Sequence, residues 1–160
     1  MLGERAPLAD ILETMVRAVE AHAGGDAVAS VLLLDREGRL RTGAAPGLPA
    51  DYNAAIDGLQ ASPFLGTCSA AAATGAVVLT PDIDAHPHWT SLKHLPLALG
   101  LVAAWSQPII GTDGAVLGTL GTYFRTTRTP REDERALVAG LAACAAVAIE
   151  QAREGRINWV

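Results

Sequence analysis

A cysteine near the middle of the chain is the first candidate for chemistry. Cys68 lies in the segment Gly66-Thr67-Cys68-Ser69, immediately before a run of alanines that ends near Gly75. At the start of a helix, unpaired backbone N–H groups lower the pKa of a thiol and favour the reactive thiolate. The alternative interpretation is a small apolar residue that packs the helix onto a sheet, because no histidine or basic residue stands beside Cys68 in the sequence.

Acidic residues and histidines in one loop form the second candidate group, which comprises Asp82, Asp84, His86 and His88, with His94 further along the chain. A metal site needs such ligands to converge from separate turns. No second ligand pair occurs at suitable spacing, so we predict no metal site. Asp82 is expected to cap a turn or to accept a hydrogen bond from a ligand. His94 would hydrogen-bond a ligand if it faces inward.

Three aromatic residues complete the candidate set. Trp89 ends the acidic loop, Trp105 lies in an apolar segment, and Phe64 shortly precedes Cys68. Large aromatic side chains at such positions fill a core or line a ligand cavity. We expect Trp89 to act as a lid or as a structural anchor, and Trp105 to form core or cavity wall. The hypothesis is that Phe64, Cys68, Trp89 and Trp105 bound a hollow interior.

These residues require a framework of strands. Apolar and β-branched runs bounded by turn residues predict five strands, at residues 27–34, 39–42, 76–80, 101–110 and 115–125. The pair Asp113-Gly114 predicts a tight hairpin between the last two. Gly118 and Gly121 in the last strand indicate a close backbone approach or a bulge.

Helical segments alternate with these strands. Apolar residues at helical spacing predict a first helix from about Leu8 to Val19. Three short helices are expected, at residues 49–59, 67–74 and 91–99, with Thr67 capping the second and Pro96 causing a kink or a late start in the third. Long antiparallel strands with helices packed on them make an α+β fold.

The last helix has a clear start and a seam of small residues. Thr129 is predicted as its N-cap, Pro130 as its first residue, and Glu132 as the partner in a capping box. Steps of four and three residues then produce a heptad seam of Leu137, Leu141, Cys144, Ala148 and Gln151. This seam predicts pairing with another helix, either in a dimer or within the monomer.

The order of these motifs resembles the GAF domain, a small-molecule sensing module of signalling proteins. The resemblance is carried by Gly66-Thr67-Cys68-Ser69, by Asp82-x-x-x-x-Pro87-x-Trp89 and by Trp105-Ser106-x-Pro108-Ile109. It covers roughly residues 8–153 of a single domain spanning 1–160. It implies a GAF/PAS-like fold with a central antiparallel sheet of five or six strands. The terminal helices would cover one face, and a ligand cavity would lie under helices and loops on the other.

The resemblance implies a sensor and not an enzyme. The motifs look like those of input modules of bacterial histidine kinases and of diguanylate cyclases or phosphodiesterases, whose catalytic domains would lie outside this chain. The implied ligand contacts are Phe64, Cys68, Asp82, Trp89, His94 and Trp105. The implied output is through the N- and C-terminal helices of a homodimer. Neither the ligand nor any cofactor is identified by these residues.

Two other functions remain open at this point. Free methionine-(R)-sulfoxide reductase, a stand-alone GAF enzyme, has a similar helix start to Cys68-Ser69-Ala70-Ala71-Ala72. That family also needs further cysteines, including a Cys-Asp pair where this chain has Ala104-Trp105. The other alternative is a dimerisation module with a filled core and no ligand.

Composition excludes several partners. A net charge of −5 with a single lysine, Lys93, argues against nucleic-acid binding. Two cysteines form no disulfide framework and favour a reduced, cytoplasmic compartment. The longest uncharged apolar stretch, residues 136–149, is shorter than the roughly 18 residues of a membrane span, so no direct membrane contact is expected.

Overall fold

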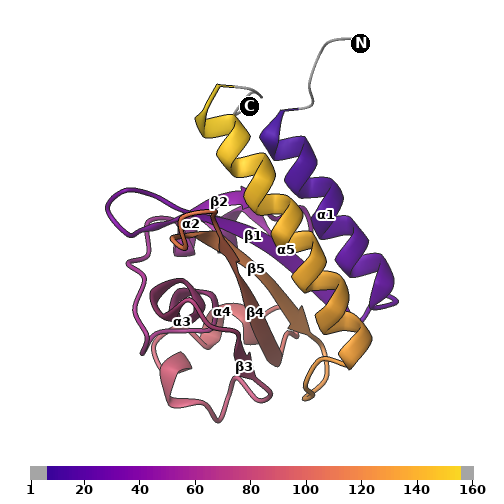
Figure 1. Cartoon of the computed structure of the whole chain (residues 1–160). Coiled ribbons are helices and arrows are strands. Elements are labelled where there is room, and N and C mark those ends of the chain that lie inside the picture. The colour runs from indigo at the N-terminus through magenta and orange to yellow at the C-terminus, as the bar shows by residue number, and fades with distance from the viewer. Residues whose placement is uncertain (1–6, 156–160) are drawn as a thin grey trace.

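One antiparallel sheet of five strands forms the centre of the computed structural model, which describes residues 7–155 (Figure 1). The strands are β1 (Ala27–Leu34), β2 (Leu40–Ala44), β3 (Val78–Thr80), β4 (Ala103–Ile110) and β5 (Val116–Phe124). Their order in the sheet is β2-β1-β5-β4-β3, and every neighbouring pair is antiparallel. The predicted α+β class and the antiparallel sheet are confirmed. The first six and last five residues of the predicted domain, 1–160, lie outside the described residues.

The two faces of the sheet carry different helices. The long helices α1 (Leu8–His22) and α5 (Glu132–Arg153) lie side by side on one face, here called the helical face (Figure 1). Four short elements cover the other face, here called the α3 face. They are α2 (Ala50–Ile56), α3 (Cys68–Thr74), the 3₁₀ turn η1 (Pro87–Trp89) and α4 (His94–Leu97). The prediction that the terminal helices share one face is confirmed.

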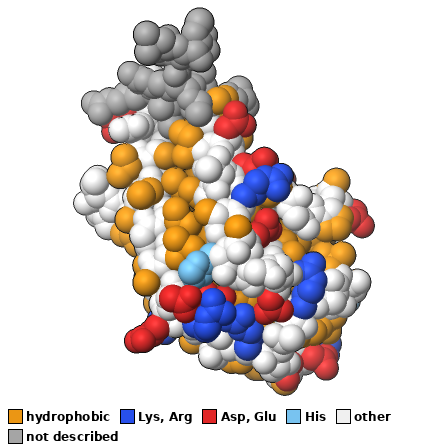
Figure 2. Space-filling view, turned by 90° about the vertical axis from the view of Figure 1, so that its right-hand side faces the viewer, with side chains coloured by type: hydrophobic (Ala, Val, Ile, Leu, Met, Phe, Trp, Pro, Cys, Tyr) orange, Lys and Arg blue, Asp and Glu red, His pale blue; other side chains and the backbone are white. Residues whose placement is uncertain are grey.

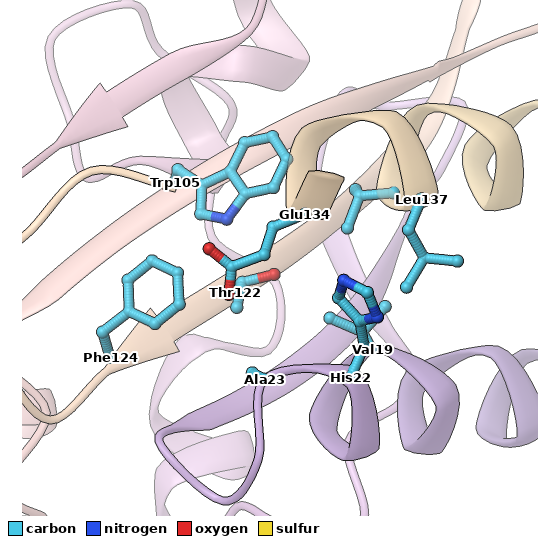
Figure 3. A pocket seen from close by; sticks show the side chains of 9 residues that line it. Val19, His22, Ala23, Trp105, Thr122, Phe124, Glu134 and Leu137 are labelled. Carbon is cyan, nitrogen blue, oxygen red and sulfur yellow. The ribbon is translucent and has the colours of Figure 1, made fainter. Parts of the chain in front are cut away.

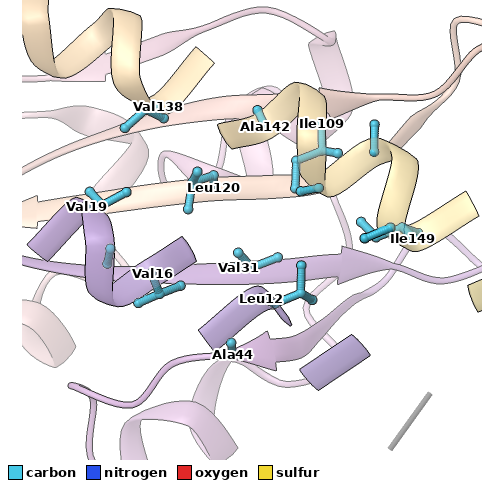
Figure 4. Close-up of a cluster of buried hydrophobic side chains, with 14 of the residues drawn as sticks. Leu12, Val16, Val19, Val31, Ala44, Ile109, Leu120, Val138, Ala142 and Ile149 are labelled. Atoms are coloured by element: carbon cyan, nitrogen blue, oxygen red, sulfur yellow. The ribbon is translucent and has the colours of Figure 1, made fainter. Parts of the chain in front are cut away.

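Aliphatic side chains fill the helical face. Leu12 of α1 and Ile149 of α5 are fully buried against Val31 of β1 and Leu120 of β5 (Figure 4). Alanines of α5 complete this cluster and let the helix lie close to the strands, because their side chains are short.

Two glycines of β5 allow other groups to come close, as the sequence predicted. A Cβ atom on Gly118 would lie 2.2 Å from the carbonyl oxygen of Leu32 in β1. A Cβ atom on Gly121 would lie 2.5 Å from the sulfur of Cys68 in α3. Only glycine therefore fits at these two positions without movement of a neighbour.

The start of α5 differs from the prediction. The helix begins at Glu132 with Arg131 as its N-cap residue, so Thr129 lies before the cap. The carboxylate of Glu134, and not of Glu132, accepts a hydrogen bond from the Arg131 backbone N–H at 2.8 Å. The sequence correctly predicted a capping box at the start of this helix but placed it two residues too early.

The helix predicted over residues 91–99 is reduced to the four residues of α4, His94–Leu97. Pro96 lies within the first turn of α4, where its missing N–H removes no helical hydrogen bond. Turns link α4 to η1, so this segment is a series of short elements and not one kinked helix. The other short helices and strands match their predicted positions to within about three residues.

By length and composition alone, α5 is apolar enough to cross a membrane. The same holds for core helices of proteins that do not span membranes, and the residues of α5 that face the sheet are buried in the aliphatic cluster.

Candidate functional site

The start of α3 lies directly on the α3 face of the sheet. The Cys68 side chain is buried, and the hydroxyl of Ser106 in β4 donates a hydrogen bond to its sulfur at 3.3 Å. Burial raises the pKa of the Cys68 thiol, and the hydrogen bond from Ser106 opposes this only in part. The cysteine is therefore held as a neutral thiol, contrary to the thiolate that its place at a helix start suggested.

Trp89 is anchored by hydroxyl groups. Its indole Nε1–H donates to Thr67 Oγ1 at 2.9 Å, and Thr67 Oγ1 lies 2.8 Å from Thr80 Oγ1. The sequence predicted that Thr67 caps α3. Its side chain makes no capping hydrogen bond, because its hydroxyl makes these contacts instead. This chain of bonds connects η1, the start of α3 and β3. Of the two interpretations of Trp89, the structural anchor is the one that these contacts describe.

Two tyrosines extend the cluster around Trp89, and sequence reasoning did not select them as site residues. The Tyr52 hydroxyl donates to the Tyr123 hydroxyl at 2.7 Å, and the two rings meet edge to face with centroids 6.1 Å apart. The rings of Trp89 and Tyr123 also meet edge to face, at 6.3 Å. Burial raises the pKa of both tyrosines, so both stay neutral. Tyr123 could have been selected from the sequence, because it lies two residues after Gly121 in β5 and alternate residues of a strand share a face.

The buried polar groups of this face carry no charge. They are the hydroxyl side chains Ser30, Thr67, Ser69, Thr80, Ser106 and Thr119. Among the described residues, the one buried side chain of an acidic or basic type is Glu134, which lies on the helical face. The α3 face therefore combines aromatic rings with neutral hydrogen-bonding groups, and Cys68 lies at its centre.

Trp105 lies on the helical face, beside residues of α1 and α5 (Figure 3). Its neighbour Ala104 packs with Cys68, whereas Trp105 itself packs with residues of α1 and α5. Successive strand residues point to opposite faces of a sheet, so Trp105 cannot share a cavity wall with Cys68. The prediction that these two residues bound the same interior is wrong.

Three further predicted residues lie at the outer rim of the α3 face. Asp82 and His94 are exposed, and Phe64 is 75% exposed. The Phe64 ring meets the His88 ring edge to face at 6.1 Å. The structure thus brings together Cys68 and Trp89, and it leaves Phe64, Asp82 and His94 outside their buried cluster.

The acidic loop is held by Ile83 and not by its carboxylates. Ile83 is fully buried in the α3-face cluster, and its backbone N–H donates to the carbonyl of Val102 at 2.8 Å. Asp84 makes an exposed ion pair with Lys93 at 3.2 Å. This loop therefore presents Asp82 and Asp84 to solvent while an aliphatic side chain fixes its position.

The side chain of His86 forms a hydrogen bond with the backbone of this loop. His86 Nδ1 accepts a hydrogen bond from the His88 backbone N–H at 3.1 Å, which caps η1. Partial burial lowers the pKa of His86, with a contribution from His88. Within residues 7–155, no group of three or more histidine, cysteine, aspartate or glutamate side chains has a geometry that could hold a metal ion.

A separate groove of about 680 Å³ lies at the end of the sheet near the last turn of α5. Its walls include Asp35, Arg36, Asp113, Glu150 and Arg153. Glu150 accepts hydrogen bonds from the backbone and hydroxyl of Thr112, and Arg153 donates to the carbonyl of Leu34. These bonds tie the last turn of α5 to β1 and to the turn between β4 and β5.

Comparison with known proteins identifies relatives of this arrangement. A family model described as the GAF domain matches residues 5–150. The methyl sulfide methyltransferase-associated sensor of Methanosarcina acetivorans is 37% identical over 150 residues, which is 93% of this chain. The chain spans 15% of the length of that sensor.

Solved structures with similar folds come from signalling proteins and from an enzyme. A domain of a protein described as a two-component sensor histidine kinase, from Sinorhizobium meliloti 1021, superposes with a TM-score of 0.75. It is 22% identical, and the match covers 93% of this chain and 94% of that one. Free methionine-R-sulfoxide reductase from Neisseria meningitidis has a TM-score of 0.70 and 20% identity, covering 92% and 81%. At these identities the likeness concerns the fold.

Proposed function

This chain belongs to the GAF domain family, and on that premise we propose that it is a sensory module that binds a small molecule and regulates a signalling output. The observation that carries the proposal is the 37% identity to a protein named as a sensor, over nearly the whole of this chain. The chain corresponds to a minor part of that sensor. The regulated activity, of histidine kinase or cyclic-di-GMP enzyme type, would therefore lie in other domains.

We propose that the ligand binds on the α3 face and is small and neutral. Aromatic rings of Trp89, Tyr52 and Tyr123 offer apolar and edge contacts, and buried hydroxyls offer hydrogen bonds without charge. Such a mixture is typical of ligand pockets. Cys68 would contact the ligand as a neutral thiol, with Phe64, Asp82 and His94 at the entrance. Trp105 would act only through the sheet, since it lies on the other face.

Ligand entry on this face requires the outer layer to move. The sulfur of Cys68 lies against Gly121 of the sheet, so α3 rests directly on β5. The layer is built from short elements joined by hydrogen bonds, such as Trp89 to Thr67 and Gly66 to His88, and by the apolar packing of this face. We propose that the ligand selects an arrangement in which α3 and η1 stand away from the sheet. A ligand shifts a conformational equilibrium only by its different affinity for the two arrangements.

Native mass spectrometry of the purified chain tests the proposal. The expected result is an excess mass of a small neutral molecule that is lost when the chain is denatured. A chain that carries no molecule, and whose melting temperature no member of a library of neutral metabolites raises, would contradict it. That outcome would favour the dimerisation module without a ligand.

The terminal helices are proposed as the output and as a homodimer interface. In α5, Leu137 and Leu141 of the predicted seam are half-buried and Ala148 is buried, whereas Cys144 and the adjacent Val147 are exposed. Figure 2 shows a band of hydrophobic side chains on the side of the molecule that carries these helices. The band supports pairing of two copies through this side.

Sedimentation analysis of a Val147→Glu variant tests this interface. Val147 is 53% exposed, so a glutamate there leaves the core intact. A dimer that dissociates at least tenfold more readily in this variant is expected. Ala55→Glu, at an exposed residue of α2 on the other face of the sheet, is the matched control. A wild-type chain that is monomeric at high concentration would contradict the interface.

The enzyme alternative has one observation in its favour, the fold likeness to methionine-R-sulfoxide reductases. Within the chain, Cys68 is buried beneath α3 and Cys144 is exposed on α5, on the opposite side of the sheet. The two sulfurs cannot form a disulfide without unfolding, which a resolving step would require. Turnover of free methionine sulfoxide that disappears in a Cys68→Ser variant would establish the enzyme.

A cytoplasmic location is proposed from the two free cysteines and the absence of a disulfide between them.

A further inference from the structure

Three buried polar atoms without hydrogen-bond partners surround one small cavity beneath the start of α5. They are Trp105 Nε1 of β4, Thr122 Oγ1 of β5 and Glu134 Oε2 of α5. All three residues line the same cavity of about 10 Å³ (Figure 3). Because buried polar groups are almost always hydrogen-bonded, three orphans that converge on one space point to an occupant.

The chemistry of the three atoms defines that occupant. An indole N–H can only donate a hydrogen bond, a carboxylate oxygen can only accept, and a hydroxyl can do either. A metal cation would face the indole hydrogen of Trp105, and an anion would face the carboxylate of Glu134. A neutral molecule that both accepts and donates satisfies all three. The cavity volume of about 10 Å³ is at the lower limit of what a single water molecule requires.

Other groups near the cavity are either apolar or already paired. Val19, Ala23, Phe124, Leu137 and Val138 form the rest of its wall together with His22. The His22 ring nitrogen Nε2 lies 2.8 Å from Asp133 Oδ2, which is not one of the three unpartnered atoms. Arg131 Nη1 lies 3.6 Å from Glu134 Oε2, which is an ion-pair contact and not a hydrogen bond.

We infer that one ordered water molecule occupies this cavity. It accepts a hydrogen bond from Trp105 Nε1 and donates to Glu134 Oε2 and Thr122 Oγ1, so that all three orphan atoms are satisfied. Buried waters of this kind make about three hydrogen bonds to otherwise unpaired groups. The inference concerns the helical face and is independent of the ligand proposed for the α3 face.

The water connects α5 to the two central strands of its face. The other carboxylate oxygen of Glu134, Oε1, is bound by Arg128 and by the Arg131 backbone N–H. Glu134 therefore uses one oxygen to hold the cap of α5 and leaves the second for the water. A shift of α5 relative to β4 and β5 separates the three atoms, so the site exists only in the present arrangement of helix and sheet.

Nuclear magnetic resonance of the full chain tests this site, because its two buried tryptophans form a matched pair. The indole of Trp105 has no protein acceptor, whereas that of Trp89 donates to Thr67 Oγ1. In a ¹⁵N-edited ROESY spectrum, with the indoles assigned by W105F and W89F, Trp105 Hε1 should show a dipolar cross-peak to water. Trp89 Hε1 should show at least a severalfold weaker peak. A Trp105 indole without such a peak, or a crystal structure in which Trp105 Nε1 donates directly to Glu134, would overturn the inference.

A Thr122→Val variant locates the water. Valine has nearly the shape of threonine but cannot hydrogen-bond, so the water loses one of its three partners. The Trp105 Hε1 resonance should shift while that of Trp89 stays in place, and the ROESY cross-peak to water should weaken. A Trp105 resonance that does not change would place the water elsewhere and overturn the assignment. Circular dichroism establishes that the variant is folded.

Discussion

Both faces of the sheet bury aliphatic side chains, but the helices and loops on them are held in different ways. The helical face is an aliphatic core of two long helices, exemplified by Leu12 and Ile149. The α3 face joins short elements through specific polar and aromatic contacts, such as Trp89 to Thr67 and Tyr52 to Tyr123. Non-directional packing stabilises one arrangement, whereas a few directional bonds between short segments can open separately. This difference supports the proposal that the α3 face binds the ligand and the helical face carries the output.

The largest effect on stability is expected from shortening a buried side chain of the helical face. Ile149→Ala should lower the free energy of unfolding by about 2–5 kcal/mol, because Ile149 is fully buried and the change leaves a cavity. Urea denaturation measures the loss. Arg135→Ala, at an exposed position of the same helix, is the control and should change stability by less than about 0.5 kcal/mol. Equal losses in the two variants would contradict the described packing of α5.

A Gly121→Ala substitution tests the contact between α3 and the sheet. The new methyl group would meet the sulfur of Cys68 at 2.5 Å, so a loss of about 1–3 kcal/mol is expected. Adding Cys68→Ala should recover much of that loss, as a thermodynamic cycle of the four proteins would show.

Gly118→Ala is the control for that cycle. Its methyl group would meet the backbone carbonyl of Leu32, which no change at Cys68 relieves. If Cys68→Ala rescues both glycine variants equally, or neither, then α3 does not rest on β5 at Gly121.

The tyrosine pair offers a smaller test of the α3 face. Tyr52→Phe removes the 2.7 Å hydrogen bond and leaves the buried Tyr123 hydroxyl without that partner, at a cost of about 1 kcal/mol. The double variant with Tyr123→Phe leaves no unpaired hydroxyl and should be no less stable than the single variant. Denaturant unfolding of the three proteins measures this. A double variant much less stable than Tyr52→Phe would contradict the claim that the two hydroxyls are each other's hydrogen-bond partners.

Alkaline pH tests the same pair. Burial raises the pKa of Tyr52 and Tyr123 in the folded chain, whereas an unfolded tyrosine titrates near pH 10. A raised folded-state pKa means that stability is complete below about pH 10 and falls as the pH rises above it. The buried Cys68 thiol adds a loss of the same sign from about pH 8.5. The melting temperature should therefore fall less steeply between pH 8 and 11 in the Tyr52→Phe, Tyr123→Phe variant than in the wild type. An equal fall in both proteins would contradict the burial of the two tyrosines.

The smallest effect is expected at the exposed ion pair of the acidic loop. Asp84→Asn should cost less than about 0.5 kcal/mol, because Asp84 and Lys93 are 68% and 41% exposed. Ile83→Ala is the comparison and should cost about 2–5 kcal/mol, since Ile83 is fully buried. Thermal unfolding of both variants measures the difference. A larger loss for Asp84→Asn would mean that charge and not burial holds the loop.

Much of the framework could be predicted because its signals are local. The spacing of Leu8 to Val19, the Asp113-Gly114 turn and the glycines of β5 each fix a feature within a few residues. The start of α5 was misplaced because Arg131 takes the cap position. This depends on the hydrogen bond that its backbone N–H donates to the Glu134 carboxylate, and not on the usual preference for threonine. The late start of α4 at His94 matches one of the two effects predicted for Pro96, a late start or a kink.

The candidate site was harder to predict because it depends on which face each side chain reaches. Trp105 and Ala104 are adjacent in the sequence but face opposite layers, and a shift of one residue exchanges them. The tyrosine pair joins residues 71 positions apart in the sequence. The three unpartnered atoms around the cavity beneath α5 lie on three separate elements, so no spacing in the sequence could predict that they converge.

The most direct test of the central proposal compares ligand retention when a tryptophan is changed on each face. Native mass spectrometry should detect the bound small molecule in the wild type and in Trp105→Phe, but with clearly reduced occupancy in Trp89→Phe. Trp89 lies in the α3-face cluster and Trp105 in the core of the helical face. Loss of the molecule in Trp105→Phe with full retention in Trp89→Phe would contradict the assignment of sensing to the α3 face.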